Sequence, residues 1–146
     1  MIGLSRGRYG SRDVVADTVV TLPTVATFLP LWAGIAPERQ VRLLALLAGE
    51  SGFWPEFPIP SVPTDARRFD ASRYWKGPTW VNTNWLVVQG LRASGAGDVA
   101  AELRDRPLDM VHRAGCFEYF SPLTGQGIGA ADFSWTAALV LDLLAD

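Results

Sequence analysis

The sequence predicts an all-α protein of five or six helices. Several stretches place their apolar residues at the i, i+3, i+4 and i+7 spacing of a buried helix face. Prolines and glycines stand where these stretches begin and end. No segment reads as a convincing strand, and no tandem repeat of about 34 or 40 residues is present. Helices that alternate with long aromatic loops indicate a helical toroid or hairpin array, with its loops gathered at one end.

Composition limits the class of protein. The chain has 146 residues, 49% of them hydrophobic, and a net charge of −2, which fits one globular domain. No cluster of lysines and arginines predicts a nucleic acid or an anionic membrane as partner. Cys116 and His112 are alone in their types, which argues against a disulfide framework, a zinc site and a Ser-His-Asp triad. We expect neither a metal nor a cofactor.

The amino terminus carries no recognisable targeting segment. Residues 1–12 are polar and glycine-rich, and they lack the apolar core of a signal peptide. No apolar run reaches the ~18 residues that a membrane-spanning helix needs. We therefore expect a soluble cytoplasmic protein, with residues 1–12 as a disordered or loop-like terminus and residues 13–146 as the folded portion.

Three helical segments are expected before residue 50. Valines and leucines at helical spacing predict the first over residues 13–22. The second is expected over residues 23–34, with a proline in its first turn and a glycine as its stop; Pro30 should kink it or limit its length. The third is expected over residues 37–49, and it is so apolar that it must be buried on more than one side.

Residues 50–77 are expected to form one long ordered loop. Its prolines exclude a regular helix and a central strand. Loops of this length inside a compact domain are usually functional or disordered, and the aromatic residues here argue against disorder. We therefore expect the loop to lie over a site. The prolines are Pro55, Pro58, Pro60 and Pro63, and the aromatic residues include Phe53, Trp54, Phe57 and Phe69.

Three further helices are expected in the second half of the chain. One should begin with Pro78 in its first turn and end between residues 90 and 94. The next should run over residues 98–112 with an aspartate as N-cap, and Pro107 should break or kink it. The last helix is almost wholly apolar, and its cap is expected to be Asp132 or Ser134.

The stretch from Arg73 to Trp85 is the first candidate for a binding site. It holds three of the six tryptophans, interleaved with Lys76, Asn82 and Asn84. Flat apolar faces beside amide and ammonium donors suit a sugar, which has an apolar ring face and a rim of hydroxyls. The alternative is core packing with satisfied polar groups, because tryptophan is also a large core residue. Lys76 has the further alternative of a surface lysine paired with an acid.

Glu118 is the carboxylate that the pattern favours for chemistry. It stands between Phe117 and Tyr119 in a loop bounded by glycine and proline. Aromatic neighbours partly desolvate a carboxylate, which can tune it for general acid or base work. The alternative is a structural glutamate that accepts hydrogen bonds from loop N–H groups. The glycine-rich run 125–129 lacks the residues of a phosphate loop and is interpreted as a turn. Other carboxylates near aromatic loops, expected to cap turns or the last helix, are Asp65, Asp70 and Asp132.

Several segments together resemble a known family. Residues 74–80 read Tyr-Trp-Lys-Gly-Pro-Thr-Trp, and residues 82–85 read Asn-Thr-Asn-Trp. Residues 117–125 read Phe-Glu-Tyr-Phe-Ser-Pro-Leu-Thr-Gly, and residues 133–137 read Phe-Ser-Trp-Thr-Ala. With residues 28–34, Phe-Leu-Pro-Leu-Trp-Ala-Gly, they resemble segments of inverting glycosidases that have an (α/α)6 barrel. The group that they resemble is glycoside hydrolase family 63 with its bacterial mannosylglycerate and glucosylglycerate hydrolases.

The resemblance implies a partial (α/α)6 toroid, namely the carboxy-terminal part of the barrel over residues 13–146. It implies that Glu118 is the general base, which activates the water that attacks an α-glycoside. Lys76 stands where the family has arginine, so it keeps the charge but loses the planar fork of the guanidinium. The residues expected to bind the sugar are Tyr74, Trp75, Lys76, Gly77, Trp80, Asn84 and Tyr119.

The resemblance also implies an incomplete site. Inversion needs two carboxyl groups roughly 6.5–9.5 Å apart, and in the family the general acid is an aspartate from a part of the barrel that this chain lacks. We therefore expect the isolated chain to be inactive or nearly so. We also expect exposed apolar helix faces that associate with the missing barrel half or with another copy. The alternative function is a non-catalytic carbohydrate-binding or helical interaction module.

Overall fold

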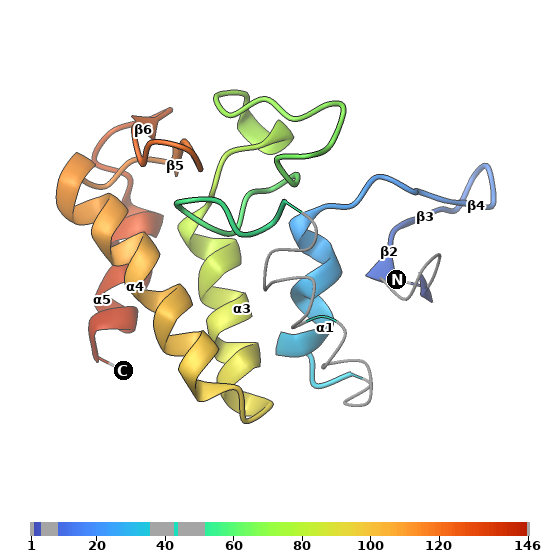
Figure 1. Ribbon diagram of the computed structural model, residues 1–146, viewed down its shortest axis with the longest axis horizontal. Coiled ribbons are helices and arrows are strands. Elements are labelled where there is room, and N and C mark those ends of the chain that lie inside the picture. The colour runs from blue at the N-terminus through green and yellow to red at the C-terminus, as the bar shows by residue number, and fades with distance from the viewer. Residues whose placement is uncertain (1, 4–8, 36–42, 44–51, 146) are drawn as a thin grey trace.

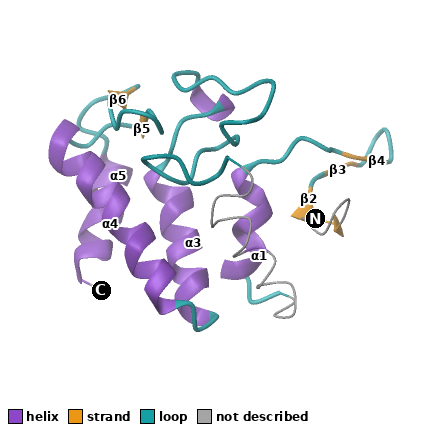
Figure 2. Cartoon of the chain, viewed as in Figure 1, coloured by secondary structure: helices purple, strands orange, loops and turns teal. Residues whose placement is uncertain are grey.

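The computed structural model describes residues 2–3, 9–35, 43 and 52–145. Its helices lie in one row, in which α3 contacts each of the other three (Figure 1). The described part is mostly helical (Figure 2), which confirms the predicted all-α class. Two single 3₁₀ turns also occur in the described residues: Val25–Phe28 leads into α1, and Tyr74–Lys76 lies in the long loop before α3. The helices are α1 (Leu29–Trp32), α3 (Val81–Ala93), α4 (Gly97–Ala114) and α5 (Ser134–Ala145).

Short strands also occur, where the sequence predicted none. Among the described residues they are two-residue segments paired into three antiparallel hairpins. Thr79 adds isolated bridges to Pro60 and to Phe120. The pairs are β1 (Ile2–Gly3) with β2 (Tyr9–Gly10), β3 (Arg12–Asp13) with β4 (Thr18–Val19), and β5 (Tyr119–Phe120) with β6 (Gly127–Ile128).

The β3–β4 hairpin replaces the helix predicted over residues 13–22. Asp13 Oδ1 accepts hydrogen bonds from the N–H groups of Val15 at 2.9 Å and Ala16 at 3.0 Å, which close a turn in place of a helix. The bonds from Ala16 and Val15, in that order, also hold the pKa of Asp13 below its ordinary value. Val14 is 84% exposed and Val15 94% exposed. The helical spacing misled the prediction because these valines meet no core.

The segment around α1 partly confirms its prediction. Val25 and Phe28 are buried, and Gly34 ends the helical stretch with φ +63°. Pro30 lies in the first turn of α1, where a missing N–H costs nothing, so it does not interrupt the helix. The helix predicted over residues 37–49 lies outside the described residues apart from Leu43, which is helical and 1% exposed.

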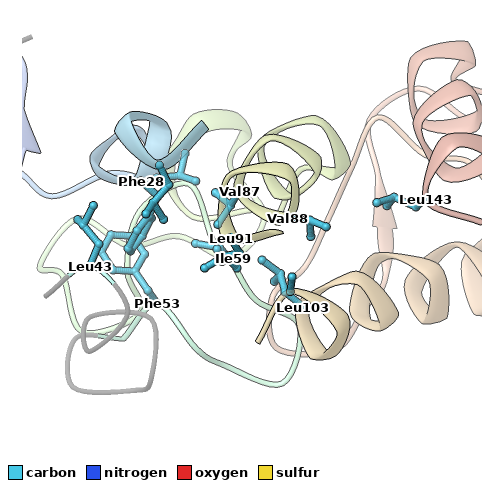
Figure 3. Packing of buried hydrophobic residues seen from close by; sticks show 12 residues of the cluster. Phe28, Leu43, Phe53, Ile59, Val87, Val88, Leu91, Leu103 and Leu143 are labelled. Carbon is cyan, nitrogen blue, oxygen red and sulfur yellow. The ribbon is translucent and has the colours of Figure 1, made fainter. Parts of the chain in front are cut away.

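The core forms where α1, α3 and α4 meet the loop that begins at residue 52 (Figure 3). Phe28 and Phe53 pack edge to face with ring centroids 5.0 Å apart. Leu143 brings α5 into the same cluster. Fully buried members are Phe28, Phe53, Ile59, Val87, Val88, Leu91, Ala100, Leu103 and Leu143.

Two predicted helix boundaries need correction. α3 begins at Val81 rather than at Pro78, because Thr79 is extended and exchanges hydrogen bonds of 2.8 and 2.9 Å with Phe120. α4 begins with Ala96 as N-cap, so Asp98 lies in its first turn instead of capping it. Pro107 lies buried inside α4, and the helix continues through it to Ala114. The predicted break at Pro107 is therefore wrong.

The two long loops gather at one end of the helix row, as predicted (Figure 1). One spans residues 52–80 and the other residues 115–133. Backbone hydrogen bonds join them, from Phe57 N–H to Pro122 C=O at 2.9 Å and between Thr79 and Phe120. None of the helices in the described residues is long and apolar enough to cross a membrane.

Gly90 marks the closest approach of α3 to α1. A Cβ at residue 90 would lie 2.5 Å from the Trp32 nitrogen and 2.6 Å from the Leu31 carbonyl carbon. These are backbone atoms, which cannot move aside. Gly90→Ala should therefore lower the free energy of unfolding by about 1–3 kcal/mol, even though alanine favours a helix by about 1 kcal/mol.

Chemical denaturation measures this effect, and Gly97→Ala is the control. Gly97 is also helical, but no atom lies within 4 Å of a Cβ built on it. Gly97→Ala should leave stability unchanged or raise it by up to about 1 kcal/mol. Equal stability of the two variants would mean that α1 does not pack on Gly90 as described.

Candidate active site

Four aromatic rings at the loop end form one cluster, here named the aromatic stack: Tyr74, Trp75, Trp80 and Tyr119. Trp75 and Trp80 are parallel within 3°, with ring centroids 4.1 Å apart. Trp80 also stacks on Tyr119 at 4.9 Å and 29°. Tyr74 meets the other three edge to face at 5.2 to 5.9 Å. Aromatic pairs in these geometries stabilise one another beyond their buried area.

The backbone brings the stack together from distant parts of the sequence. Trp80 is the N-cap of α3 and Tyr119 lies in β5, and the bridge between Thr79 and Phe120 holds them side by side. The Trp80 indole N–H donates to the Tyr74 carbonyl at 3.3 Å. Thr79 Oγ1 donates to the Phe57 carbonyl at 2.7 Å, which ties the end of the long loop to its first part.

Exposure divides the stack into a support and a surface. Trp80 is 3% exposed and lies against both Trp75 and Tyr119. Both faces of its ring are therefore covered by neighbouring rings, so the expected role of Trp80 in lining the sugar subsite would fall to its edge. Trp75 is 42% exposed and Tyr74 is 50% exposed, so these two residues present the open surface.

Glu118 lies beside the stack. Its Oε2 accepts a hydrogen bond from the Ala130 N–H at 3.4 Å, and its own N–H donates to the Ala130 carbonyl at 2.9 Å. The side chain is half-buried, and it lines the same narrow cleft as Trp80, which is too tight in this chain to hold a water molecule. The sequence prediction that Glu118 and the tryptophans lie close together is met at Trp80. The cleft is lined by Trp80, Asn82, Glu118, Phe133, Trp135, Thr136 and Leu139.

Two of the lining residues, Trp135 and Asn82, are able to contact a ligand but were not among the residues predicted to bind the sugar. Trp135, in the first turn of α5, is 52% exposed, which is unusual for an indole in an otherwise aliphatic helix. Asn82, in the first turn of α3, accepts a hydrogen bond from the Thr83 N–H through Oδ1 at 2.8 Å. Its Nδ2 is therefore the group that it can offer to a ligand. Both residues stood inside the quoted motifs, but the motifs do not show which side chains face the cleft.

Asn84 was predicted to bind the sugar, and that prediction is wrong. Its side chain is 0% exposed. Its Oδ1 accepts from the Ile59 N–H at 2.9 Å, and its Nδ2 donates to the carbonyls of Trp80 at 2.9 Å and Ile59 at 3.4 Å. The amide thus fastens the long loop to the start of α3 and has no face toward a ligand.

Gly77 also serves the fold instead of contacting a sugar. It is buried, its N–H donates to Ser61 Oγ at 3.1 Å, and a Cβ there would lie 2.2 Å from the Asp70 carbonyl oxygen. Only glycine allows the chain to pass Asp70 at this distance. The sequence prediction of a direct sugar contact therefore does not hold for Gly77.

Besides Glu118, the charged residues near the stack are Lys76, Arg73 and Asp70, of which Asp70 is half-buried and the two cations are exposed. Lys76 is exposed beside Trp75, at the end of the 3₁₀ turn. Asp70 caps the preceding turn, as predicted: its Oδ1 accepts from the Ser72 N–H at 3.0 Å and from the Ser72 hydroxyl at 2.9 Å. These bonds, with smaller contributions from the nearby Arg73 and Lys76 charges, hold the pKa of Asp70 below its ordinary value.

The remaining candidates lie apart from the stack. His112 lines a groove between α4 and α5, and Cys116 is a half-buried free thiol at the start of the second loop. Asp132 is exposed and has φ +53°, two residues before α5 begins. Within the described ranges, no group of three acidic, histidine or cysteine residues is arranged to hold a metal ion.

Comparison with known proteins gives the family. A profile described as "Mannosylglycerate hydrolase MGH1-like glycoside hydrolase domain" matches residues 5–136. The mannosylglycerate hydrolase of Thermus thermophilus is 43% identical over 135 residues, which are 92% of this chain and 32% of the relative. The glucosylglycerate hydrolase of Mycolicibacterium hassiacum is 35% identical and covers 90% of this chain and 31% of its own length. The chain thus spans about a third of the length of these relatives.

Solved structures agree with the sequence comparison. A family 63 mannosylglycerate hydrolase from Thermus thermophilus in complex with glucose superposes with a TM-score of 0.87 at 42% identity, over 96% of this chain and 35% of the other. Neutral trehalase from Saccharomyces cerevisiae, at 22% identity and a TM-score of 0.76, shares the fold. These matches confirm the predicted helical class and are consistent with part of an (α/α)6 toroid. The chain belongs to the mannosylglycerate hydrolase-like glycoside hydrolases of family 63.

Proposed function

We propose that this chain supplies the base-bearing part of an inverting glycoside hydrolase that acts on an α-glycoside of the mannosylglycerate or glucosylglycerate type. The observation that carries the proposal is the position of Glu118, half-buried beside the aromatic stack and in one cleft with Trp80. The relatives named above are hydrolases of these two glycosides, and structures of one relative hold glucose or D-glycerate.

In the proposed reaction, Glu118 accepts a proton from a water molecule. The water oxygen forms a bond to the anomeric carbon while the bond from that carbon to the glycerate oxygen breaks. The electron pair goes to the leaving oxygen, which takes a proton from a general acid. Attack from the face opposite the leaving group inverts the configuration, so an α-glycoside gives a β-sugar.

The sugar would rest on the open surface of the stack. The exposed faces of Trp75 and Tyr74 suit the apolar face of a pyranose ring, and Tyr119 and Trp80 hold these rings from below. Lys76 stands next to this surface and would reach a hydroxyl or the carboxylate of glycerate as a single point charge. Asn82 and Trp135 would contact the substrate from the cleft side.

The general acid would come from polypeptide outside the matched third of the enzyme. Among the described residues that line the cleft, Glu118 is the one carboxylate. Inversion needs a second carboxyl group roughly 6.5–9.5 Å away. We therefore propose that the chain works only with the remaining barrel, whether that barrel is part of the same polypeptide or a separate one.

We propose that the remaining barrel docks on the exposed face of α5. Leu141 is 68% exposed and Leu144 is 65% exposed, and the two lie on neighbouring sides of the helix, about 60° apart. Beside them lies a groove lined by Leu108, Val111, Val140 and Leu144, with Asp109 and His112 at its rim. In a toroid every helix has neighbours on both sides, so this exposed apolar face fits barrel helices as its occupant.

Without those helices, the face should drive association of the isolated chain. A double variant, Leu141→Asp and Leu144→Asp, should shift the purified protein toward monomer in sedimentation velocity experiments, because two charges cannot be buried at low cost. The control is Ala101→Asp, which adds a charge at an exposed position of α4. A wild-type chain that is monomeric at all concentrations would contradict the docking proposal.

The function itself is tested with a chimera. In it, this chain replaces the aligned 135-residue section of Thermus thermophilus mannosylglycerate hydrolase. We expect the chimera to hydrolyse mannosylglycerate or glucosylglycerate, and the isolated chain to release no glycerate. A folded chimera without activity on either glycoside would contradict the proposal.

The second candidate is a non-catalytic module that binds carbohydrate or other helices. The single carboxylate among the described cleft residues favours it. The two candidates differ in one result. A non-catalytic module would bind mannosylglycerate in isothermal titration calorimetry, yet its chimera would remain inactive with an intact fold.

A further inference from the structure

In the β5–β6 hairpin, the glycine-rich run 125–129 lies beside Glu118 and Tyr119. The sequence analysis interpreted this run only as a turn. Tyr119 pairs with Ile128 and Phe120 pairs with Gly127, so the residue after β6 lies next to the start of β5. That residue is Gly129, with φ +80°. Its position brings the backbone directly against the side chain of the proposed base.

The space at Gly129 is already filled by the two functional side chains. A Cβ at residue 129 would lie 2.6 Å from Glu118 Oε2, 3.0 Å from Glu118 Cβ and 2.8 Å from Tyr119 Cε1. Each of these distances is shorter than a normal van der Waals contact. A single methyl group at this position would therefore push on the carboxylate and on the tyrosine ring at once.

Ala130, the residue after Gly129, binds the Glu118 carboxylate. The Ala130 N–H donates to Glu118 Oε2 at 3.4 Å, and the Ala130 carbonyl accepts from the Glu118 N–H at 2.9 Å. The bare backbone at Gly129 lets Ala130 come this close. Tyr119 in turn stacks on Trp80 with ring centroids 4.9 Å apart, so a change at residue 129 would also affect the aromatic stack.

We propose that Gly129 is a positioning residue, which sets the orientation of the Glu118 carboxylate and of the Tyr119 ring relative to the aromatic stack. The catalytic meaning of this role rests on the proposed function of Glu118. The contact of Gly129 with Glu118 and Tyr119 belongs to the hairpin itself, so it can be tested without measuring catalysis. Gly127 belongs to a different contact, since a Cβ there would lie 2.2 Å from Phe117 Cδ2.

The chain contains a matched control. Gly95, in the turn between α3 and α4, has φ +81°, and no atom lies within 4 Å of a Cβ built on it. Gly95→Ala and Gly129→Ala therefore both place alanine at nearly the same positive φ, which alanine disfavours. Any additional effect of Gly129→Ala comes from the contact with Glu118 and Tyr119.

The first measurement uses the full 146-residue chain. Near-ultraviolet circular dichroism reports the coupled rings of the aromatic stack. Gly129→Ala should change this spectrum, and Gly95→Ala should leave it as in the wild type, while both variants lower the denaturant midpoint. Identical spectra for the two variants would overturn the proposal. If Gly129→Ala does not fold, Gly129→Asn and Gly95→Asn repeat the comparison, because asparagine tolerates a positive φ better.

The second measurement uses the chimera. Gly129→Ala should lower kcat by about 10²-fold, because a misplaced base loses rate, and KM should change less, through the Tyr119 ring that supports the sugar surface. Gly95→Ala should keep kcat within a few-fold of the parent. Equal kcat values for the two variants would overturn the positioning role. A chimera that stays active after Glu118→Gln would instead refute the function proposed for Glu118, and the spectral comparison would still stand.

Discussion

Replacing Glu118 by glutamine should lower hydrolysis by the chimera by about 10²- to 10⁴-fold, the range that a general base contributes. Glutamine keeps the size of the side chain and can still accept the Ala130 N–H bond seen for Glu118 Oε2. It cannot take a proton from water. The loss should therefore appear in kcat, with KM and the denaturant midpoint close to those of the parent. Release of glycerate over time is the measurement.

Glu102→Gln is the matched control for this prediction. Glu102 is exposed on α4 and forms an i, i+4 ion pair with Arg106, far from the loop end. Its replacement should leave the rate unchanged, because exposed pairs of this kind contribute little. A rate for Glu118→Gln within tenfold of the parent would show that another group is the base.

A second variant distinguishes activity lost because the base is missing from activity lost because the site is disturbed. In Glu118→Ala, azide can attack the anomeric carbon without any base, because it is already an anion. The leaving glycerate oxygen would still take its proton from the general acid. We therefore expect azide to restore turnover and to give a glycosyl azide of inverted configuration. No product with azide would indicate that Glu118→Ala had disturbed the sugar surface.

Removing the buried amide of Asn84 should cost the fold about 2–5 kcal/mol, the second-largest effect that we expect. Asn84→Ala would leave the Ile59 N–H and C=O without their present partners in a fully buried place. Each buried polar group left unsatisfied costs about 1–3 kcal/mol. The Trp80 carbonyl would keep bonds from the Asn84 N–H and from Thr83 Oγ1.

Urea denaturation of the isolated chain measures the effect, and Asn82→Ala is the control. Asn82 makes one side-chain bond, to the Thr83 N–H, and is only half-buried. Its loss should cost about 0.5–2 kcal/mol, as for other residues near a helix start. If Asn84→Ala is as stable as Asn82→Ala, the amide does not fasten the loop and the sugar-binding prediction for Asn84 returns.

The sequence predicted the second half of the fold well because local signals and packing agree there. α4 and α5 combine helical spacing with turns at Gly95 and Gly115, and both helices have a partner on which to pack. The prolines of the long loop excluded a helix and a central strand, so the sequence also predicted that this segment is a loop at the loop end of the molecule. Pro107 was the exception, because a proline buried against neighbouring helices can stay inside a helix when packing compensates the lost hydrogen bond.

The first half shows why spacing alone is insufficient. The valines at residues 14 and 15 have helical spacing, but the Asp13 side chain caps a turn and leaves them in solvent. Helix spacing predicts a helix only when its apolar face is buried, and burial depends on contacts that the local sequence does not specify. The same limit displaced the start of α3, where pairing of Thr79 with Phe120 across forty residues of sequence outweighs the local signal of Pro78.

For the site, the sequence showed which residues belong together but not which way each one faces. Glu118 and Trp80 meet in one cleft, as the aromatic pattern indicated. The pattern could not show that Trp80 is covered by Trp75 and Tyr119, or that Asn84 points into the fold. Residues one position apart at the start of a helix differ by about 100° in direction, so one motif mixes buried and exposed members.

The anomeric configuration of the first product tests the central claim most directly. Proton NMR of the chimera acting on an α-glycoside should show the β-sugar first, followed by slow mutarotation, and Glu118→Gln should give no product on the same time scale. The isolated 146-residue chain should also give none. Initial release of the α-sugar, or turnover by the isolated chain that survives Glu118→Gln, would contradict an inverting site whose base is Glu118.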